Sequence, residues 1–291
     1  KKEVALNSEI RVENLLISFG DKISSGEYII HSKFKNSVNF YYKEKLITLG
    51  NKKIGSGPSN IIFEKNYFEN VKKVSIFDDS FYLDNKKFMI EKEKIYSSDL
   101  IISNFDINNF YKNLRVFEMY LKIFSKDRGL LPVIDENIEN NKNFINNFTK
   151  RIYEGTNYLF NIDLIKGIRL IKGVGVGLTP SGDDFISGLL TALKVLEIIN
   201  KENNSYLRKI IYDNAKGDNL ISNNFLFYAS EGLFFERTKK LILSLFYGSE
   251  SEIVDSTLSI LQIGETSGVD FSTGFLITIR KGGLYGSKRF N

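Results

Sequence analysis

The sequence contains no cysteine and no tryptophan, and its 291 residues include one histidine, three prolines and two methionines. Without cysteine, the chain cannot form a disulfide, present a thiolate nucleophile or bind zinc or iron–sulfur clusters through sulfur. Because His31 is the sole imidazole, a Ser/His/Asp triad would have to use it, and we expect instead a partly exposed histidine on a strand. Any bound metal must then be held mainly by oxygen, which favours magnesium, calcium or manganese.

Long apolar runs are also absent, because nothing in the sequence approaches 18 consecutive apolar residues. The first ten residues, KKEVALNSEI, lack the apolar segment of a signal peptide. We therefore expect a cytoplasmic protein that does not contact a membrane. The net charge of +5 would suit a nucleic acid, but the lysines alternate with acids and form no basic stripe. No nucleic-acid partner is expected.

The composition changes along the chain, which predicts an α+β protein with two domains. Residues 1–103 read as β-rich, with short β-branched and aromatic runs separated by Gly, Asn, Asp and Lys clusters. These runs cover residues 28–30, 37–42, 46–49, 60–63 and 73–77, and Asp84-Asn85 is typical of a hairpin turn. Regular short strands of this kind favour a small barrel or sandwich.

The remainder, residues 104–291, has helical periodicity and predicts a mostly helical domain. A helix beginning near Asp106 should end near Asp127–Gly129, and further helices are expected at 151–160, 185–199, 203–214, 219–247 and 250–262. The asparagine-rich stretch 136–148 is either a loop or the start of a weak helix.

The chain's most informative stretch is GVGVGLTPSGDDF, residues 173–185. Three alternate glycines precede Thr-Pro-Ser-Gly and two adjacent aspartates, and an apolar helical segment follows. A glycine-rich turn at a helix N-terminus can bind an anion, because unpaired N–H groups and the helix dipole point to the same place. Two carboxylates would repel a bare phosphate, but they could hold a cation such as Mg²⁺ that binds one.

The same stretch also fits a plain capped helix start, with Thr179 or Ser181 as the N-cap. Asp184 lies three residues after Ser181, as in a capping box, and would return a hydrogen bond to it. Because successive helical positions are about 100° apart, Asp183 would be freer to reach a ligand or cation. The motif is not a dinucleotide fingerprint, and no Lys-Ser/Thr pair follows as in a Walker loop.

A second turn, residues 264–270, repeats this pattern of Thr/Ser, Gly and Asp before an apolar helix. Each helix then carries a glycine four residues after its aspartate, Gly188 and Gly274. Glycine is unfavourable inside a helix, so we expect each helix to pack closely against the other helix or against a ligand. We also expect the two turns to face one cleft. Ser222 and Asn223 either point into the same site or belong to a solvated helix start. The glycine turn at 54–60 is expected to be a plain β-connection.

The stretch GVGVGLTPSGDDFISGLL resembles the signature of the AllH-like family, whose usual form is close to GxGxGLTPSGDDFLxGxL. Two departures occur: Val174 and Val176 stand where other small residues or Pro would be expected, and Phe271 replaces a more usual polar or aliphatic residue after Asp270. Neither departure removes a charged group. Four further stretches also resemble family patterns: HSKFKNSVNFYY, GSGPSNIIF, LISNNFLFYASEGLFFE and GETSGVDFSTGFL. The resemblance implies a subunit of an oxamate carbamoyltransferase in anaerobic allantoin breakdown, working with FdrA-like and AllG-like partners. That enzyme converts oxalurate and phosphate into oxamate and carbamoyl phosphate.

Phosphorolysis of a carbamoyl group needs a bound phosphate and a polarised carbonyl, which glycine N–H groups and a cation can supply. We therefore expect the catalytic residues to be Asp183, Asp184 and Ser181, with the two aspartates as possible Mg²⁺ ligands. The expected substrate- or anion-binding residues are Gly173, Gly175, Gly177, Thr179, Gly182, Ser222, Asn223, Thr266, Ser267, Gly268 and Asp270. Two alternatives stay open, a non-catalytic scaffold or binding subunit and a Mg²⁺-dependent phosphotransferase.

Overall fold

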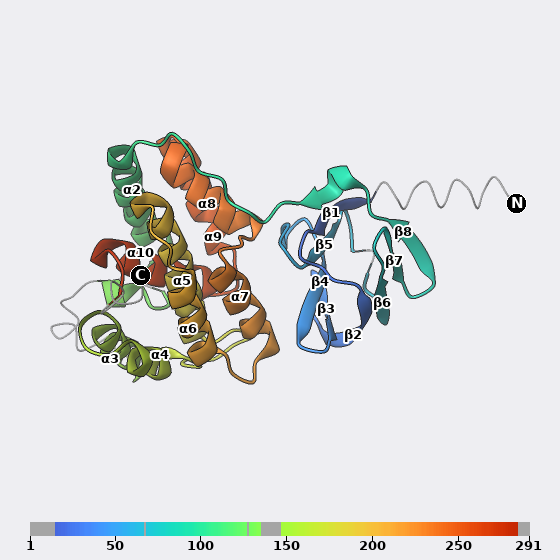
Figure 1. Ribbon diagram of the computed structural model, residues 1–291, viewed down its shortest axis with the longest axis horizontal. Helices are drawn as coiled ribbons and strands as arrows, with labels where there is room; N and C mark the ends of the chain where they lie inside the picture. Colours follow the sequence, from blue (N-terminus) through green and yellow to red (C-terminus); the bar gives the residue numbers. More distant parts are fainter. Residues whose placement is uncertain (1–14, 67, 127, 135–146, 285–291) are drawn as a thin grey trace, which may run out of the picture. The chain divides into compact units, whose positions relative to one another are not determined.

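The computed structural model describes residues 15–66, 68–126, 128–134 and 147–284 (Figure 1). The chain divides into two compact units, which are described separately. One comprises Lys1–Asp99 with Phe234–Glu236, and the other Leu100–Leu233 with Arg237–Asn291. The first is a curled sheet and the second a region of helices, so the predicted α+β class is confirmed.

The described residues of the sheet unit form one nine-stranded sheet, curled into a half-barrel rather than a closed barrel or a sandwich of two sheets. Its strand order is β8-β7-β6-β2-β3-β4-β5-β1-β9, mostly antiparallel, with parallel pairs β4–β5 and β1–β9. Aromatic side chains fill the concave core, where the stacked rings of Phe81 and Phe88 lie 5.0 Å apart. The strands are β1 (Leu16–Gly20), β2 (Gly26–Lys33), β3 (Ser37–Tyr42), β4 (Lys45–Asn51), β5 (Asn60–Phe63), β6 (Lys73–Ile76), β7 (Ser80–Leu83), β8 (Lys86–Met89) and β9 (Ile95–Tyr96).

Two local predictions in this unit are confirmed. Asp84 and Asn85 form the turn between the antiparallel strands β7 and β8, with Asp84 at φ 52°, a conformation that Asp tolerates better than most residues. His31 is exposed on β2, where its ring lies edge-on to Tyr41 at 6.0 Å.

The glycine turn at 54–60 does more than connect β4 to β5. Ser56 exchanges two hydrogen bonds with Glu236, from Ser56 N–H to Glu236 Oε2 at 2.6 Å and from Glu236 N–H to Ser56 O at 2.9 Å. A Cβ atom at Gly57 would lie 2.3 Å from the Phe235 ring, so only glycine fits there. The turn is therefore the place where the segment Phe234–Glu236 attaches to the sheet unit.

The helical unit contains α2 (Ile107–Ser125), α3 (Asn147–Asn161), α4 (Leu164–Ile171), α5 (Ser181–Asn200), α6 (Ser205–Ala215), α7 (Leu220–Glu231), α8 (Glu236–Tyr247), α9 (Glu250–Leu261) and α10 (Ser267–Lys281). The predicted helix at 219–247 is wrong, because Gly232 adopts φ 72° and ends α7 in a left-handed cap. The periodicity also gave no prediction of α4. Most of the stretch 136–148 lies outside the described residues.

Helices α5 and α10 form the centre of this unit, and most residues of each are buried. A Cβ at Gly188 would lie 1.9 Å from the carbonyl oxygen of Phe271, and one at Gly274 would lie 2.0 Å from that of Phe185. The two glycines thus let the backbones touch in a reciprocal way. The prediction that these glycine-bearing helices pack closely is confirmed.

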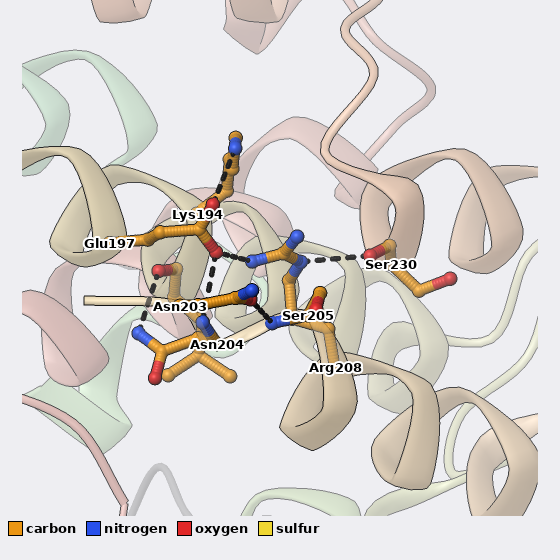
Figure 2. Close-up of polar contacts among 8 residues, drawn as sticks. Lys194, Glu197, Asn203, Asn204, Ser205, Arg208 and Ser230 are labelled. Atoms are coloured by element: carbon orange, nitrogen blue, oxygen red, sulfur yellow. Dashed lines mark hydrogen bonds and ion pairs between the residues drawn. The ribbon is translucent and has the colours of Figure 1, made fainter. Parts of the chain in front are cut away.

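A polar network fixes the end of α5 to α6 and α7 (Figure 2). Arg208, only 3% exposed, pairs with Glu197 and donates a hydrogen bond to the carbonyl oxygen of Ser230 at 2.8 Å. Burial acts to raise the pKa of Glu197, but hydrogen bonds from Lys194 and Arg208 outweigh it and leave that pKa below its ordinary value. The C-terminal half of α5 is therefore held rigidly.

No helix in the described part of the chain combines the length and apolar character needed to cross a membrane.

Candidate functional site

The turns that precede α5 and α10 have the same local structure. In each, a glycine at the start of the helix packs against the helix that comes before the turn. A Cβ at Gly182 would lie 1.9 Å from the carbonyl oxygen of Ile171 at the end of α4, and one at Gly268 would lie 2.1 Å from that of Ile260 in α9. We call residues 173–184 the α5 turn and residues 264–270 the α10 turn. Both begin a helix by pressing a glycine against the preceding helix.

The α5 and α10 turns lie against each other, as the sequence predicted. The hydroxyl oxygens of Thr179 and Ser267 are 3.2 Å apart. The charge of Asp270 also acts on Asp184, and the Ser181 hydroxyl lies beside Asp270. Side chains from both turns therefore form one polar cluster at the paired N-termini of two central helices.

The predicted capping of α5 is wrong. Pro180 is the N-cap residue, with φ −61° and ψ 143°, and no side chain caps the helix. Ser181 is already the first helical residue, so it cannot form a capping box with Asp184. The Thr179 hydroxyl instead donates a hydrogen bond to Asp184 Oδ2 at 3.0 Å. Asp184 is consequently available to the cluster and is not used by the helix start.

Asp183 has the bracing role that the sequence analysis gave to Asp184. Its side chain is 7% exposed, and Oδ1 accepts a hydrogen bond from the N–H of Gly173 at 2.7 Å. Burial raises the pKa of Asp183, opposed by the Gly173 N–H, the Ser222 hydroxyl beside it and the charge of Lys172. This carboxylate closes the base of the glycine loop.

Asp184 is the most perturbed carboxyl of the cluster. Burial raises its pKa to about 8, against the hydrogen-bonding hydroxyls of Ser267 and Thr179. The neighbouring charges of Asp270 and Asp183 raise it further. At neutral pH Asp184 is therefore largely protonated, and it can donate a hydrogen bond as well as accept one.

Asp270 lies behind Asp184 and is fully buried. Its Oδ1 accepts a hydrogen bond from the N–H of Leu130 at 2.7 Å, and a Cβ at Gly129 would lie 2.4 Å from the same oxygen. Oδ2 makes no hydrogen bond of acceptable geometry to any described residue. Burial raises the pKa of Asp270, while the nearby Ser181 hydroxyl, the Leu130 N–H and the Thr266 hydroxyl oppose this.

The glycine loop of the α5 turn is open. Gly173, Gly175 and Gly177 have φ of 69°, 110° and 115°, which residues with a side chain rarely adopt. Within the described residues, the N–H groups of residues 175–179 donate no hydrogen bond. Val176 is 80% exposed, and Asn219 holds the loop by donating from Nδ2 to the carbonyl oxygen of Leu178 at 2.8 Å. The loop thus offers a run of unused donors to an anion.

Some of the remaining predicted residues hold the backbone or pack helices together, whereas Ser222 has a hydroxyl with no such engagement. Asn223 exchanges two hydrogen bonds with the backbone of Gly217, at 2.7 and 2.9 Å, so its amide is already engaged. Gly182 and Gly268 serve helix packing. Ser222 is 2% exposed next to Asp183, and its Oγ makes no acceptable hydrogen bond to a described residue.

The described residues do not fit the Mg²⁺ site suggested by the paired aspartates. No group of three or more His, Asp or Glu side chains in this part of the chain is placed to hold a metal ion. Asp183 Oδ1 already accepts the N–H of Gly173, so one of the two expected ligands is engaged in holding the glycine loop.

Sequence reasoning missed Leu130 and Asn219, which hold Asp270 and the glycine loop respectively. Gly129 was recognised only as the end of a helix. Its packing against Asp270 depends on a contact 141 positions away in the chain, and no local pattern signals such a contact.

A shallow hollow on the sheet unit is lined by residues of β6 and β7 and of the turns that follow these two strands, and none of the predicted site residues lines it. The chemistry-bearing groups are gathered instead at the α5 and α10 turns.

Comparison with known families gives a match on the helical unit. Residues 171–279 match the family described as oxamate carbamoyltransferase subunit AllH. No curated protein and no solved structure matches the chain. The matched region starts at the end of α4 and includes both turns, α5, and α10 up to Ile279. The match supports the resemblance to the AllH-like family that the glycine motif shows, and it covers this part of the helical unit.

Proposed function

We propose that this chain is a subunit of a carbamoyltransferase of the oxamate type, and that the α5 and α10 turns bind the group being transferred. The observation that carries the proposal is the placement of Asp184, a largely protonated carboxyl, beside a loop of unused N–H donors. Carbamoyl transfer requires these two functions, a donor for a carbonyl oxygen and a cradle for an anion.

The chemistry is balanced without a redox step. An oxygen of hydrogen phosphate attacks the terminal carbonyl carbon of oxalurate, and the bond from that carbon to the inner nitrogen breaks. The products are carbamoyl phosphate and oxamate, whose nitrogen takes the proton that phosphate loses. In this scheme the Asp184 carboxyl donates a hydrogen bond to the carbonyl oxygen as negative charge develops there. The N–H groups of residues 175–179 receive phosphate or the substrate carboxylate.

FdrA-like and AllG-like proteins are the proposed partners, with allantoin catabolism in the cytoplasm as the setting. The family description supports protein partners in general, because it names a subunit. The identity of the partners and the setting come from what the resemblance of the glycine motif implies. One observation also favours a binding subunit without chemistry of its own. Val176 and Leu178 are 80% and 49% exposed on the glycine loop, as suits a surface that a partner covers.

The test is to assay the chain with its FdrA-like and AllG-like neighbours for formation of carbamoyl phosphate from oxalurate and phosphate. We expect activity from the complex and a loss of about 100-fold or more in kcat for Asp184→Asn, as for removal of a positioned acid. Asp213→Asn is the matched control, because this α6 carboxylate is a surface ion-pair partner.

The outcomes separate the two candidates. An inactive complex would refute carbamoyl transfer as the function. If the complex is active and Asp184→Asn retains full activity, the chain is a binding subunit and the chemistry resides on a partner. Binding of the partners should be measured in parallel, so that a lost complex is not mistaken for lost chemistry.

A further inference from the structure

The outer face of α2 carries an exposed row of apolar side chains. Val116, Met119 and Ile123 follow one another at intervals of three and four residues, so they lie in line along the helix. Met119 is 46% exposed and Ile123 is 55% exposed, while Val116 is half-buried. Single exposed apolar residues are common on protein surfaces, but a continuous group of them marks a contact surface. We call these three residues the α2 strip.

The other faces of α2 are occupied by the helical unit itself. One face is buried in the core of the unit. On one border of that face, the Tyr120 hydroxyl donates a hydrogen bond to Glu250 Oε1 of α9 at 2.7 Å. On the other border, Glu118 pairs with Arg280 of α10. Because successive helical residues are about 100° apart, the α2 strip lies on the side of the helix opposite the core, between these two borders.

The charges that α2 itself places beside the strip are positive. Lys112 and Arg115 are both exposed, and neither forms an ion pair with a residue that the structure describes. Glu118 is the one carboxylate within α2, and Lys122 and Arg280 already engage it. The surface therefore combines exposed apolar groups with positive charge that no acid of the same helix offsets.

A second helix is the element that fits such a row. Spacings of three and four residues form the seam of paired helices, where apolar side chains of one helix insert between those of the other. Arg115 directly precedes Val116 and so takes a bordering position, from which charged residues pair across the seam. Lys112 continues the row four residues before Val116. The complementary helix is therefore apolar along one side and acidic at its border.

The same charges argue against two other occupants. A second copy of this chain would bring Lys112 and Arg115 against their own equivalents, and like charges across an interface repel. A helix that lies on a membrane needs a broad apolar face. The broad apolar face of α2 is buried in the core, and the strip that remains is only one row wide.

We propose that the α2 strip, with Lys112 and Arg115 beside it, binds an amphipathic helix of a partner subunit, and that acidic residues border the apolar side of that helix. The inference rests on the proposed function, which makes the chain a subunit of a complex. It assigns α2 to assembly of the complex and leaves the α5 and α10 turns to bind the transferred group.

Assembly of the complex tests the apolar part of this surface. We would measure binding of the full chain to the FdrA-like and AllG-like subunits by calorimetry. Ile123→Ser should weaken binding to one of them by at least about 10-fold, as truncation of a well-packed interface residue does. Ile162→Ser is the matched control, because Ile162 is 50% exposed between α3 and α4, and it should leave the affinity unchanged.

Charge reversal tests the acidic border of the partner helix. Arg115→Glu should weaken the same binding by about 10-fold or more, because it sets a negative charge beside acids, and the loss should shrink at high salt. Lys209→Glu on α6 is the control, since its side chain is 71% exposed on another helix. In the complex, the photoreactive variant Met119→benzoylphenylalanine should cross-link to a helix with Asp or Glu within one turn of the attachment point.

Unchanged affinity in Ile123→Ser overturns the inference, as does equal weakening by Arg115→Glu and Lys209→Glu, or no binding of either subunit. Self-association, or binding to phosphatidylserine vesicles, that Ile123→Ser abolishes would also overturn it. The proposed function fails separately. A complex that assembles through α2 but forms no carbamoyl phosphate from oxalurate keeps the inference and removes the function. An active complex whose assembly does not depend on the α2 strip does the reverse.

Discussion

The α5 and α10 turns are two versions of one construction, and their differences separate structure from function. The helix after each turn begins with Ser-Gly, packs that glycine against the preceding helix and has an aspartate at its fourth position. In the α5 turn, the N–H of Gly182 donates to the carbonyl oxygen of Val174, eight positions earlier. In the α10 turn, the N–H of Gly268 donates to the carbonyl oxygen of Ile263, only five positions earlier. The extra residues form the open glycine loop.

The two aspartates also differ in what surrounds them. Asp270 is fully buried and held by Leu130, whereas Asp184 is partly exposed and hydrogen-bonded only by hydroxyls. Asp183 adds a brace for the loop at a position where α10 has Val269. The α10 turn is therefore a closed, structural version, and the α5 turn is the version opened to a ligand.

The largest expected effect tests the part that the two helices share. Gly188→Ala and Gly274→Ala each place a methyl group about 2 Å from a backbone carbonyl oxygen of the facing helix. Because the backbone cannot yield as a flexible side chain does, each should lower the free energy of unfolding by about 3 kcal/mol or more. Urea denaturation measures this.

Gly217→Ala is the matched control, since nothing lies within 4 Å of its Cβ position and its φ is not positive. It should change stability by less than about 1 kcal/mol. If one of Gly188→Ala and Gly274→Ala were as harmless as the control, the reciprocal packing of α5 and α10 would be refuted.

The second effect tests the contrast between the two aspartates. Asp270→Ala leaves the buried N–H of Leu130 without its acceptor, which should cost about 1–3 kcal/mol. Asp184→Ala removes a carboxyl that burial disfavours in its charged form, and should cost less than about 1 kcal/mol at pH 7. Thermal and urea unfolding of both variants gives the comparison.

Ser256→Ala provides the baseline for removing a buried polar atom, because Ser256 Oγ has no hydrogen-bond partner among the described residues. We expect it to be close to neutral. Equal costs for Asp184→Ala and Asp270→Ala would mean that both turns are structural, and the site would have to be sought elsewhere.

Sequence patterns predicted the features that depend on local spacing. The strands at 37–42 and 60–63, the paired glycines of α5 and α10, and the nearness of the α5 and α10 turns all follow from periodicity or repeated motifs. The two-residue strand β9 and the eight-residue helix α4 are too short to give a period, so they were missed.

The roles of Asp183 and Asp184 could not be read from spacing. The capping-box pattern at Ser181 depends on which residue begins the helix, and Pro180 takes the N-cap position with an extended ψ of 143°. Because the helix begins at Ser181, Asp183 accepts a hydrogen bond from the N–H of Gly173 and Asp184 accepts one from the Thr179 hydroxyl. Contacts from Leu130 and Asn219 come from distant segments, which only the fold brings together.

The last test concerns the pH dependence of stability and sharpens the same contrast. The pKa of Asp184 is about 8 in the folded protein against an ordinary value of 3.8, which the unfolded chain retains. Below pH 4 Asp184 is protonated in both the folded and the unfolded state, so its contribution to the free energy of unfolding is fully present. Between pH 4 and pH 8 the unfolded state binds fewer protons, so stability falls as pH rises, by up to about 1.4 kcal/mol per pH unit. Above pH 8 the loss is complete.

Asp183 and Asp270 also have raised pKa values, so the wild-type slope includes all three groups. The difference between wild type and Asp184→Asn isolates one of them, because the amide does not titrate. Urea denaturation at intervals from pH 5 to pH 9 should show the variant gaining on the wild type up to about pH 8 and then running parallel. Asp213→Asn should not show this gain. If the Asp184→Asn and wild-type curves ran parallel throughout, Asp184 would be an ordinary ionised carboxylate, and its difference from a solvated surface acid would disappear.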